Sequence, residues 1–279
     1  MRQREFAPIG PHGPHRVAWT EWGDPDNPRV VMCVHGLTRN GRDFDVLARE
    51  LCGRYRVVCP DVAGRGRSQW LEHPLDYGYP LYLSDMRALV DELGAARVDW
   101  VGTSMGGLIG MLMAATPGNP IARLVMNDVG PFIPRAALER IADYVGRDPR
   151  FRSLAEAEAC LRQVHAPFGP LSDDDWRHMA QHGTRVAPDG LLALGYDPAI
   201  AQAFGGPLAD VDLWPAWDVL TCPVLVLRGA ESDLLDGTTT VRMRDTDPAR
   251  VSVVTFPGVG HAPALTTPDQ VAAVSAFLA

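Results

Sequence analysis

The 279-residue sequence contains no uninterrupted apolar run of 18 residues, so no transmembrane helix is expected. Residues Met1 to Pro8 carry charges and lack an apolar segment, which argues against a secretory signal. Basic residues are also in deficit: 26 Lys and Arg oppose 34 Asp and Glu, giving a net charge of −8. This balance argues against a nucleic-acid partner, because binding phosphates requires a surplus of cations. We therefore expect a cytoplasmic protein without nucleic-acid or membrane partners.

Cysteine is scarce and shows no pairing pattern. There are five cysteines, without a C-x-x-C pair or a Cys/His cluster of zinc-ligand spacing. Cys33 and Cys59 lie inside apolar runs, where a thiol behaves as a small apolar side chain. The sequence predicts free thiols and no metal site.

What the chain does contain is typical of one α/β domain. Apolar residues make up 46% and charged residues 22%, as in ordinary globular proteins. The continuous apolar run Val30–Val34 is typical of a strand buried on both faces, and the mainly apolar segments Tyr55–Cys59 and Pro223–Gly229 are predicted to be further buried strands. Helical stretches at about 43–51 and 81–93 separate the early strands. This alternation predicts parallel strands joined by crossover helices.

The alternation stops in the middle of the chain. From about Gly130 to Leu220 we expect no strong strand, only helical stretches separated by Pro and Gly. A segment of this length is too long for a loop. The prediction is a helical cap, residues 131–217, inserted into a core formed by residues 1–130 and 218–279.

The most informative motif is Gly102-Thr103-Ser104-Met105-Gly106, between an apolar strand and a helix. A strand–turn–helix with G-x-S-x-G is the signature of a nucleophile elbow, which exposes the serine oxygen at the carboxyl end of the sheet. The flanking glycines relieve clashes in a strained turn. Ser104 is therefore the candidate nucleophile.

A serine nucleophile needs a base, and the base needs an orienting acid. Of eight histidines, His261 lies in a glycine-rich loop just after the last strand, so we expect it to reach Ser104. For the acid we favour Asp233, which follows the penultimate strand. Asp128, at the end of the strand after the elbow helix, is the competitor.

The negative oxygen of a tetrahedral intermediate requires hydrogen-bond donors. We predict the backbone N–H of Met105, at the start of the elbow helix, and that of Leu37, in the loop after the Val30–Val34 strand. His35, next to this loop, is expected to be structural.

Four pieces in this order resemble the α/β-hydrolase superfamily: His35-Gly36, the Asp61–Ser68 loop with its D-x-x-G-x-G-x-S pattern, the Gly102–Gly107 elbow, and the Asp233/His261 pair. The resemblance covers nearly the whole chain. It implies an α/β fold with a mostly parallel sheet of about eight strands, flanking helices, a cap over the pocket, and no cofactor.

The resemblance implies a serine hydrolase, and ester hydrolysis is the commonest activity in the superfamily. Relatives that remove halide or open epoxides place an aspartate where this chain has Ser104. Arg39, just beyond the Leu37 loop, is a candidate partner for the carboxylate of an acidic ester such as a short hydroxyacid oligomer. Phe168 and Trp176 in the cap are candidate lining residues of an acyl pocket.

Two alternatives remain open from the sequence. The same triad serves C–C bond hydrolases and enol-lactonases, and hormone receptors on this fold bind small molecules without useful turnover. For each of these functions the expected ligand is a small molecule, and for the favoured prediction it is an ester. The chain is expected to be a monomer or a homodimer.

Overall fold

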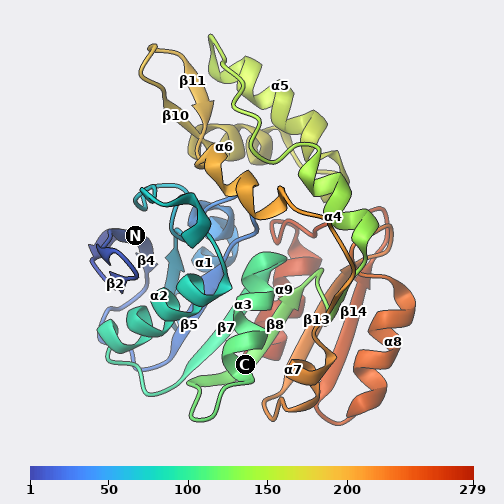
Figure 1. Cartoon of the computed structure of the whole chain (residues 1–279). Coiled ribbons are helices and arrows are strands. Elements are labelled where there is room, and N and C mark those ends of the chain that lie inside the picture. The colour runs from blue at the N-terminus through green and yellow to red at the C-terminus, as the bar shows by residue number, and fades with distance from the viewer.

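The computed structural model describes all 279 residues, and an eight-stranded sheet forms its centre (Figure 1). The order across the sheet is β1 (Arg2–Phe6), β4 (Val17–Trp22), β6 (Arg56–Pro60), β5 (Val30–Val34), β7 (Val98–Thr103), β8 (Ile121–Asn127), β13 (Val224–Gly229) and β14 (Val251–Phe256). The β1–β4 and β4–β6 pairs are antiparallel and all other pairs are parallel. The predicted mostly parallel, eight-stranded α/β fold is confirmed.

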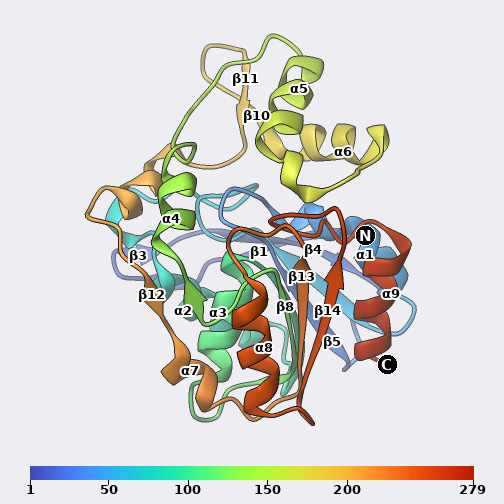
Figure 2. The ribbon, with the colours of Figure 1, turned by 90° about the vertical axis from the view of Figure 1, so that its right-hand side faces the viewer.

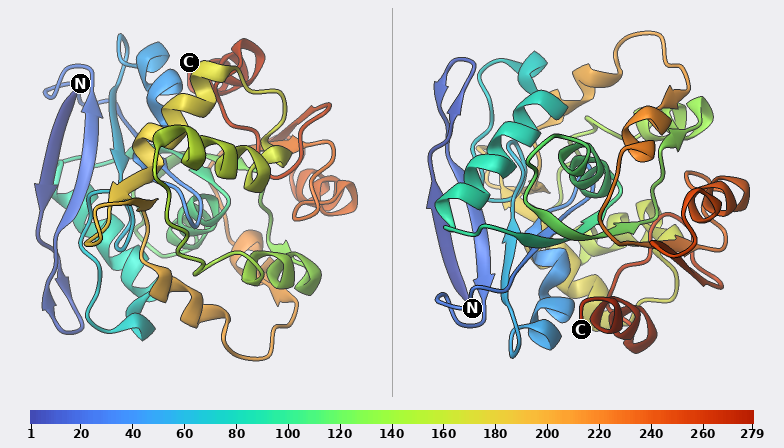
Figure 3. Two further views of the ribbon diagram at one scale, coloured as in Figure 1. Left: turned by 90° about the horizontal axis from the view of Figure 1, so that it is seen from above. Right: turned by 90° about the horizontal axis from the view of Figure 1, so that it is seen from below.

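Helices cover both faces of this sheet (Figure 3). One face packs with α2 (Tyr79–Glu92), α3 (Met105–Ala114) and α7 (Trp214–Asp218), and the opposite face with α1 (Asp45–Leu51) and α9 (Pro268–Phe277). Helix α8 (Gly237–Thr246) packs beside β14. Strand β5 is buried along its whole length, as its continuous apolar run predicts for a strand covered on both faces.

Most predicted elements occur within a few residues of their expected bounds, and the range of β5 agrees residue for residue. The sequence did not indicate the edge strand β1 or helix α8. The remaining short elements of the core are β2 (Ile9–Gly10), β3 (Gly13–Pro14) and the 3₁₀ helices η1 (Gly41–Phe44) and η2 (Pro74–Asp76). All five cysteines are free, as expected.

The middle of the chain lies above the carboxyl ends of the parallel strands (Figure 2). It contains α4 (Arg135–Ala142), α5 (Leu154–Val164), α6 (Asp173–Gly183), η3 (Ala166–Phe168) and η4 (Pro198–Phe204). The expectation of a segment without strands was wrong: β10 (Thr184–Val186) pairs with β11 (Leu192–Leu194), and β9 (Phe132–Ile133) pairs with β12 (Val211–Asp212). These pairs are only two or three residues long, too short for a clear alternating pattern.

The β9–β12 pair joins the two connections between the middle segment and the sheet, with Val211 opposite Ile133. The division into a core of residues 1–130 and 218–279 and a cap of residues 131–217 stays a prediction. No helix combines the length and the apolar character needed to cross a membrane.

Candidate active site

Ser104 lies between the end of β7 and the start of α3, in a turn with φ of +51°. This left-handed conformation is uncommon for a residue other than glycine and marks local strain. A Cβ atom on Gly102 would lie 2.2 Å from the carbonyl oxygen of Gly106, and one on Gly106 would lie 2.0 Å from that of Val34. Only glycine fits at either position, which explains the spacing of the G-x-S-x-G motif.

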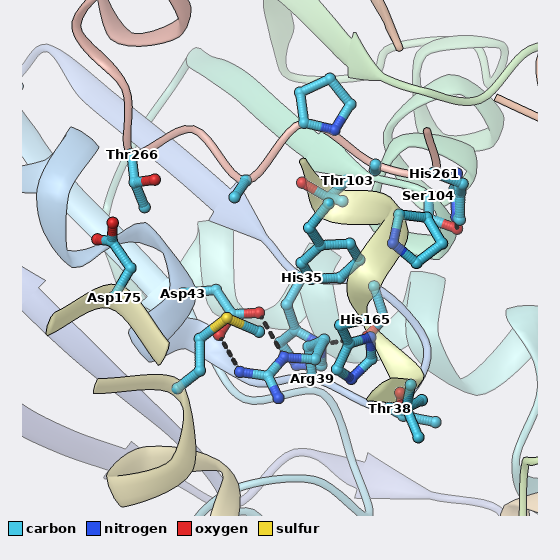
Figure 4. A pocket seen from close by; sticks show the side chains of 18 of the residues that line it. His35, Thr38, Arg39, Asp43, Thr103, Ser104, His165, Asp175, His261 and Thr266 are labelled. Atoms are coloured by element: carbon cyan, nitrogen blue, oxygen red, sulfur yellow. Dashed lines mark hydrogen bonds and ion pairs between the residues drawn. The ribbon is translucent and has the colours of Figure 1, made fainter. Parts of the chain in front are cut away.

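The structure brings Ser104 and His261 together, as the sequence predicted. The Nε2 atom of His261 lies 2.9 Å from Oγ of Ser104 (Figure 4). Asn127 connects the two segments, because its side-chain amide donates to the hydroxyl of Thr103 and to the carbonyl of Pro263. An imidazole at this distance is within reach of the serine proton.

Asp128 is the carboxylate that contacts His261. Its Oδ2 lies 2.8 Å from Nδ1 of the imidazole and also accepts a hydrogen bond from the hydroxyl of Ser232. Its Oδ1 accepts from the backbone N–H of Gly229 at 2.7 Å. The side chain is fully buried, and three donors hold it in one orientation.

The expectation that Asp233 orients His261 was therefore wrong. Asp233 is half-exposed and forms a bidentate ion pair with Arg140 of helix α4. It stands four residues beyond the end of β13, where the turn carries its side chain toward α4. Asp128 directly follows β8, whose last residue Asn127 is paired with Thr103. The register of β7 and β8 thus places Asp128 beside the elbow.

Two backbone N–H groups near Ser104 have no acceptor within the protein: those of Leu37 and Met105. Met105 is the first residue of α3, so its N–H has no partner inside the helix. Gly36, before Leu37, packs against Ser104: a Cβ atom there would lie 3.7 Å from the serine Cβ. Both groups predicted from the sequence to bind an oxyanion are therefore free to donate hydrogen bonds to a ligand.

Arg65 is a fully buried cation next to these N–H groups, and none of its hydrogen bonds goes to a carboxylate. Its Nε donates to the carbonyl of Leu37 at 2.8 Å, and its Nη1 donates to the carbonyl of Ala63 and to the hydroxyl of Tyr82. Its Nη2 lies 3.7 Å from the sulfur of Met105. The D-x-x-G-x-G-x-S pattern does not by itself reveal that Arg65 is buried.

His35 connects the loop that contains Leu37 to the loop that contains Arg65. Its Nδ1 donates to the carbonyl of Gly36 at 2.7 Å and its Nε2 accepts from the N–H of Val62 at 2.9 Å, which requires the neutral ring. Burial lowers the pKa of His35 from 6.5 to about 4, and the nearby Arg65 charge contributes. The structural role expected for His35 agrees with these contacts.

Two cavities meet at Ser104. The first has a volume of about 280 Å³, and 10 of its 27 lining residues are hydrophobic; its charged and polar lining includes Arg39, Asp43, His165 and His261. The second has a volume of about 540 Å³, and 19 of its 23 lining residues are hydrophobic. Only Leu37, Ser104 and Ile141 line both cavities.

In the first cavity Arg39 is already paired. Its guanidinium forms a bidentate ion pair with Asp43, with distances of 2.8 and 2.6 Å (Figure 4). Burial opposes the charge of Asp43, yet Arg39 holds the pKa of this carboxyl below its usual range. Asp43 thus neutralises the charge of Arg39, while Nη1 of Arg39 has no hydrogen-bond partner within the protein. The predicted contact of Arg39 with a substrate carboxylate stays a prediction.

The two predicted cap residues have different surroundings. Phe168 lines the first cavity and not the apolar second one, and it packs against His165 with ring centroids 4.6 Å apart. Trp176 lines neither cavity; it is buried in the cap beneath the guanidinium of Arg162. A tryptophan in a predicted helix can either pack in the protein interior or line a ligand cavity, and Trp176 packs in the interior of the cap.

His165 also lines the first cavity, and its side chain makes no hydrogen bond. Burial lowers its pKa from 6.5 to about 3, and the Arg39 charge adds to this effect. The ring is therefore neutral near pH 7 and offers one donor and one acceptor to a ligand.

One group of side chains has the composition of a metal site: Asp45, His178 and His182. Arg42 occupies its centre, with bidentate contacts to Asp45 and an Nη1 atom 3.3 Å from Nδ1 of His182. An arginine in this position supplies the positive charge that a metal would bring. The cluster is thus an ion-paired contact between α6 and α1.

The fold, the nucleophile turn and the Ser104–His261–Asp128 arrangement together define a hydrolase of the α/β class. The model of the alpha/beta hydrolase family matches residues 31–274, and the chain belongs to this family. It is 47% identical to a 3-hydroxybutyrate-oligomer hydrolase from Cupriavidus necator, with 96% of this chain and 94% of the relative covered.

More distant relatives and solved structures agree with this class. A 2-(acetamidomethylene)succinate hydrolase from Mesorhizobium japonicum is 28% identical and covers 83% of this chain and 81% of its own. The crystal structure of an alpha/beta hydrolase from Novosphingobium aromaticivorans has a TM-score of 0.88 and 38% identity, with coverage of 99% of this chain and 97% of the other.

Proposed function

We propose that this protein is a serine esterase that cleaves small carboxylic esters through an acyl-enzyme, with short hydroxyacid oligomers as its substrate class. The observation that carries the proposal is the hydrogen-bonded series Ser104–His261–Asp128, with distances of 2.9 and 2.8 Å. The activity named for the Cupriavidus necator relative supports the choice of hydroxyacid esters.

In the first half of the reaction, Oγ of Ser104 forms a bond to the ester carbonyl carbon while its proton moves to Nε2 of His261. The resulting oxyanion accepts hydrogen bonds from the N–H groups of Leu37 and Met105. The carbon–oxygen bond to the alcohol then breaks, and the departing alkoxide takes the proton from His261. Asp128 keeps the imidazole in the required tautomer and stabilises its charged form.

In the second half, water attacks the acyl-enzyme and gives its proton to His261. The bond to Oγ of Ser104 breaks, the serine recovers the proton, and the carboxylic acid leaves. A non-catalytic receptor would not require the unpaired N–H groups beside the serine, so these donors favour turnover over binding alone.

The test is hydrolysis of the 3-hydroxybutyrate dimer and trimer by the wild type and by Ser104→Ala, with product acids quantified by chromatography. We expect turnover by the wild type and a loss of at least about 10⁴-fold in the variant. Equal rates for the two proteins would refute the serine mechanism. A folded wild type inactive on these oligomers and on p-nitrophenyl esters would refute ester hydrolysis and favour C–C or lactone chemistry.

A further inference from the structure

Ser104 lies where the first cavity, here called the charged cavity, meets the second, here called the apolar cavity. This position determines the orientation in which a substrate binds. The two cavities differ strongly in lining. Six charged residues and four histidines contribute to the first, whereas Asp210 is the sole charged residue of the second. An ester bound at Ser104 therefore has one part in each environment.

The residues around Ser104 distinguish the two directions. His261 lines the charged cavity but not the apolar one, and Met105 lines the apolar cavity but not the charged one. His261 must deliver a proton to the departing alkoxide, so the alcohol part lies against His261. The oxyanion points to the N–H groups of Leu37 and Met105, which leaves the apolar cavity for the acyl chain.

We propose that the enzyme binds its ester in one orientation, with an apolar acyl chain in the cavity beside Met105 and a carboxylate-bearing alcohol part in the cavity beside His261. This inference rests on the proposed ester hydrolysis and adds to it which cavity holds the acyl part and which holds the alcohol part of the substrate. Esters whose carboxylate lies in the alcohol part are good substrates; esters with a carboxylate in the acyl part are poor ones.

The lining chemistry agrees with this orientation. In the charged cavity the neutral His165 ring has no partner within the protein, and Arg39 retains N–H groups not used by Asp43. These donors suit a carboxylate on the alcohol side. In the apolar cavity Leu108, Leu138 and Phe204 provide no hydrogen-bond partner for a charged group. A carboxylate placed there would lose hydration, with no cation in the lining and with the like-charged Asp210 and a few tyrosine hydroxyls as its polar surroundings.

The orientation can be tested with two constitutional isomers. In 3-acetoxybutyrate the carboxylate belongs to the alcohol part, and in monoethyl succinate it belongs to the acyl part. We expect kcat/KM to be at least about tenfold higher for 3-acetoxybutyrate, because an unpaired buried charge is penalised in only one isomer. Equal values, or a preference for monoethyl succinate, would overturn the orientation.

Two matched substitutions test which cavity holds the acyl part of the ester and which holds the alcohol part. Leu138 is half-buried on α4 and lines only the apolar cavity, and Val164 is 41% exposed at the end of α5 and lines only the charged cavity. Leu138→Trp should reduce activity on octanoate relative to acetate p-nitrophenyl esters by about tenfold or more. Val164→Trp should leave this ratio unchanged and reduce activity on acetates of bulky alcohols.

The orientation would be overturned if Val164→Trp lowered the octanoate-to-acetate ratio and Leu138→Trp reduced activity on acetates of bulky alcohols. The proposed esterase activity would stand in that case. Ala203→Phe, at the exposed rim of the apolar cavity, replaces Leu138→Trp if that variant fails to fold. A wild type that hydrolyses none of these esters would refute the proposed function and the orientation together.

Discussion

The carboxylate of Asp128 lies 2.8 Å from the His261 imidazole, although 133 positions separate the two residues in the sequence. Asp128 has φ of +55°, a left-handed backbone conformation rare for a residue with a side chain. The N–H of Gly229 and the hydroxyl of Ser232 hold its two carboxylate oxygens. The contact therefore depends on strands β8 and β13 being neighbours.

The first prediction separates the two candidate acids. Asp128→Asn should lower kcat by about 10⁴-fold, because the amide holds the imidazole in the wrong tautomer. Asp233→Asn should change kcat by less than about threefold, since it removes only a half-exposed ion pair with Arg140. Steady-state kinetics of both variants on one ester shows which of the two carboxylates orients His261. A severe loss in Asp233→Asn with a mild one in Asp128→Asn would contradict the assignment.

The second prediction concerns Arg65. Arg65→Met removes the hydrogen bond to the Leu37 carbonyl and the buried charge beside the two free N–H groups. We expect kcat to fall by about 10- to 100-fold with a smaller change in KM, because the interaction strengthens as the oxyanion develops. Arg65→Lys, which keeps the charge, should recover part of the loss. A rise in KM at constant kcat would instead indicate a ground-state contact.

The third prediction tests the close packing of the elbow. Gly106→Ala places a Cβ atom 2.0 Å from the Val34 carbonyl oxygen at the end of β5, so β5 and α3 must move apart. We expect a loss of at least about 3 kcal/mol in the free energy of unfolding, measured by urea denaturation. Gly53→Ala is the matched control, because a Cβ atom there has no neighbour within 4 Å. Similar free energies of unfolding for Gly106→Ala and Gly53→Ala would show that the elbow tolerates the methyl group.

The fourth prediction is a pH dependence of stability through His35. Its pKa is about 4 in the folded protein and 6.5 in the unfolded chain, so between these values the unfolded state binds more protons. Stability contributed by the neutral ring is present above pH 6.5 and is lost as the pH falls toward 4. The loss is about 3 kcal/mol for this shift.

His35→Gln removes this titration. Urea denaturation of both proteins at several pH values between 7 and 4 should show a shallower decline for the variant than for the wild type. His165 and His182, whose pKa values burial also lowers, contribute to the decline that remains. Identical slopes for the two proteins would show that His35 does not titrate in this range.

Much of the sheet was predictable because buried parallel strands are continuous apolar runs, as in Val30–Val34. Edge strand β1 was missed because its residues Arg2–Phe6 are mostly polar and partly exposed. The β10–β11 hairpin was missed because three residues per strand give too little periodicity. Trp176 was assigned to the pocket because composition does not distinguish a packed aromatic ring from one that lines a cavity.

The sequence by itself predicted that Ser104 and His261 lie together, next to the N–H groups of Leu37 and Met105. Local rules sufficed for these, since a G-x-S-x-G turn between strand and helix needs glycine at each close approach, as at Gly102 and Gly106. The identity of the acid required the order of strands. Asp128 and Asp233 both follow strands, but β8 lies between β7 and β13. Only tertiary structure placed Asp128 beside Ser104, because the hydrogen-bonded neighbours of a strand are set by sheet assembly and not by local sequence.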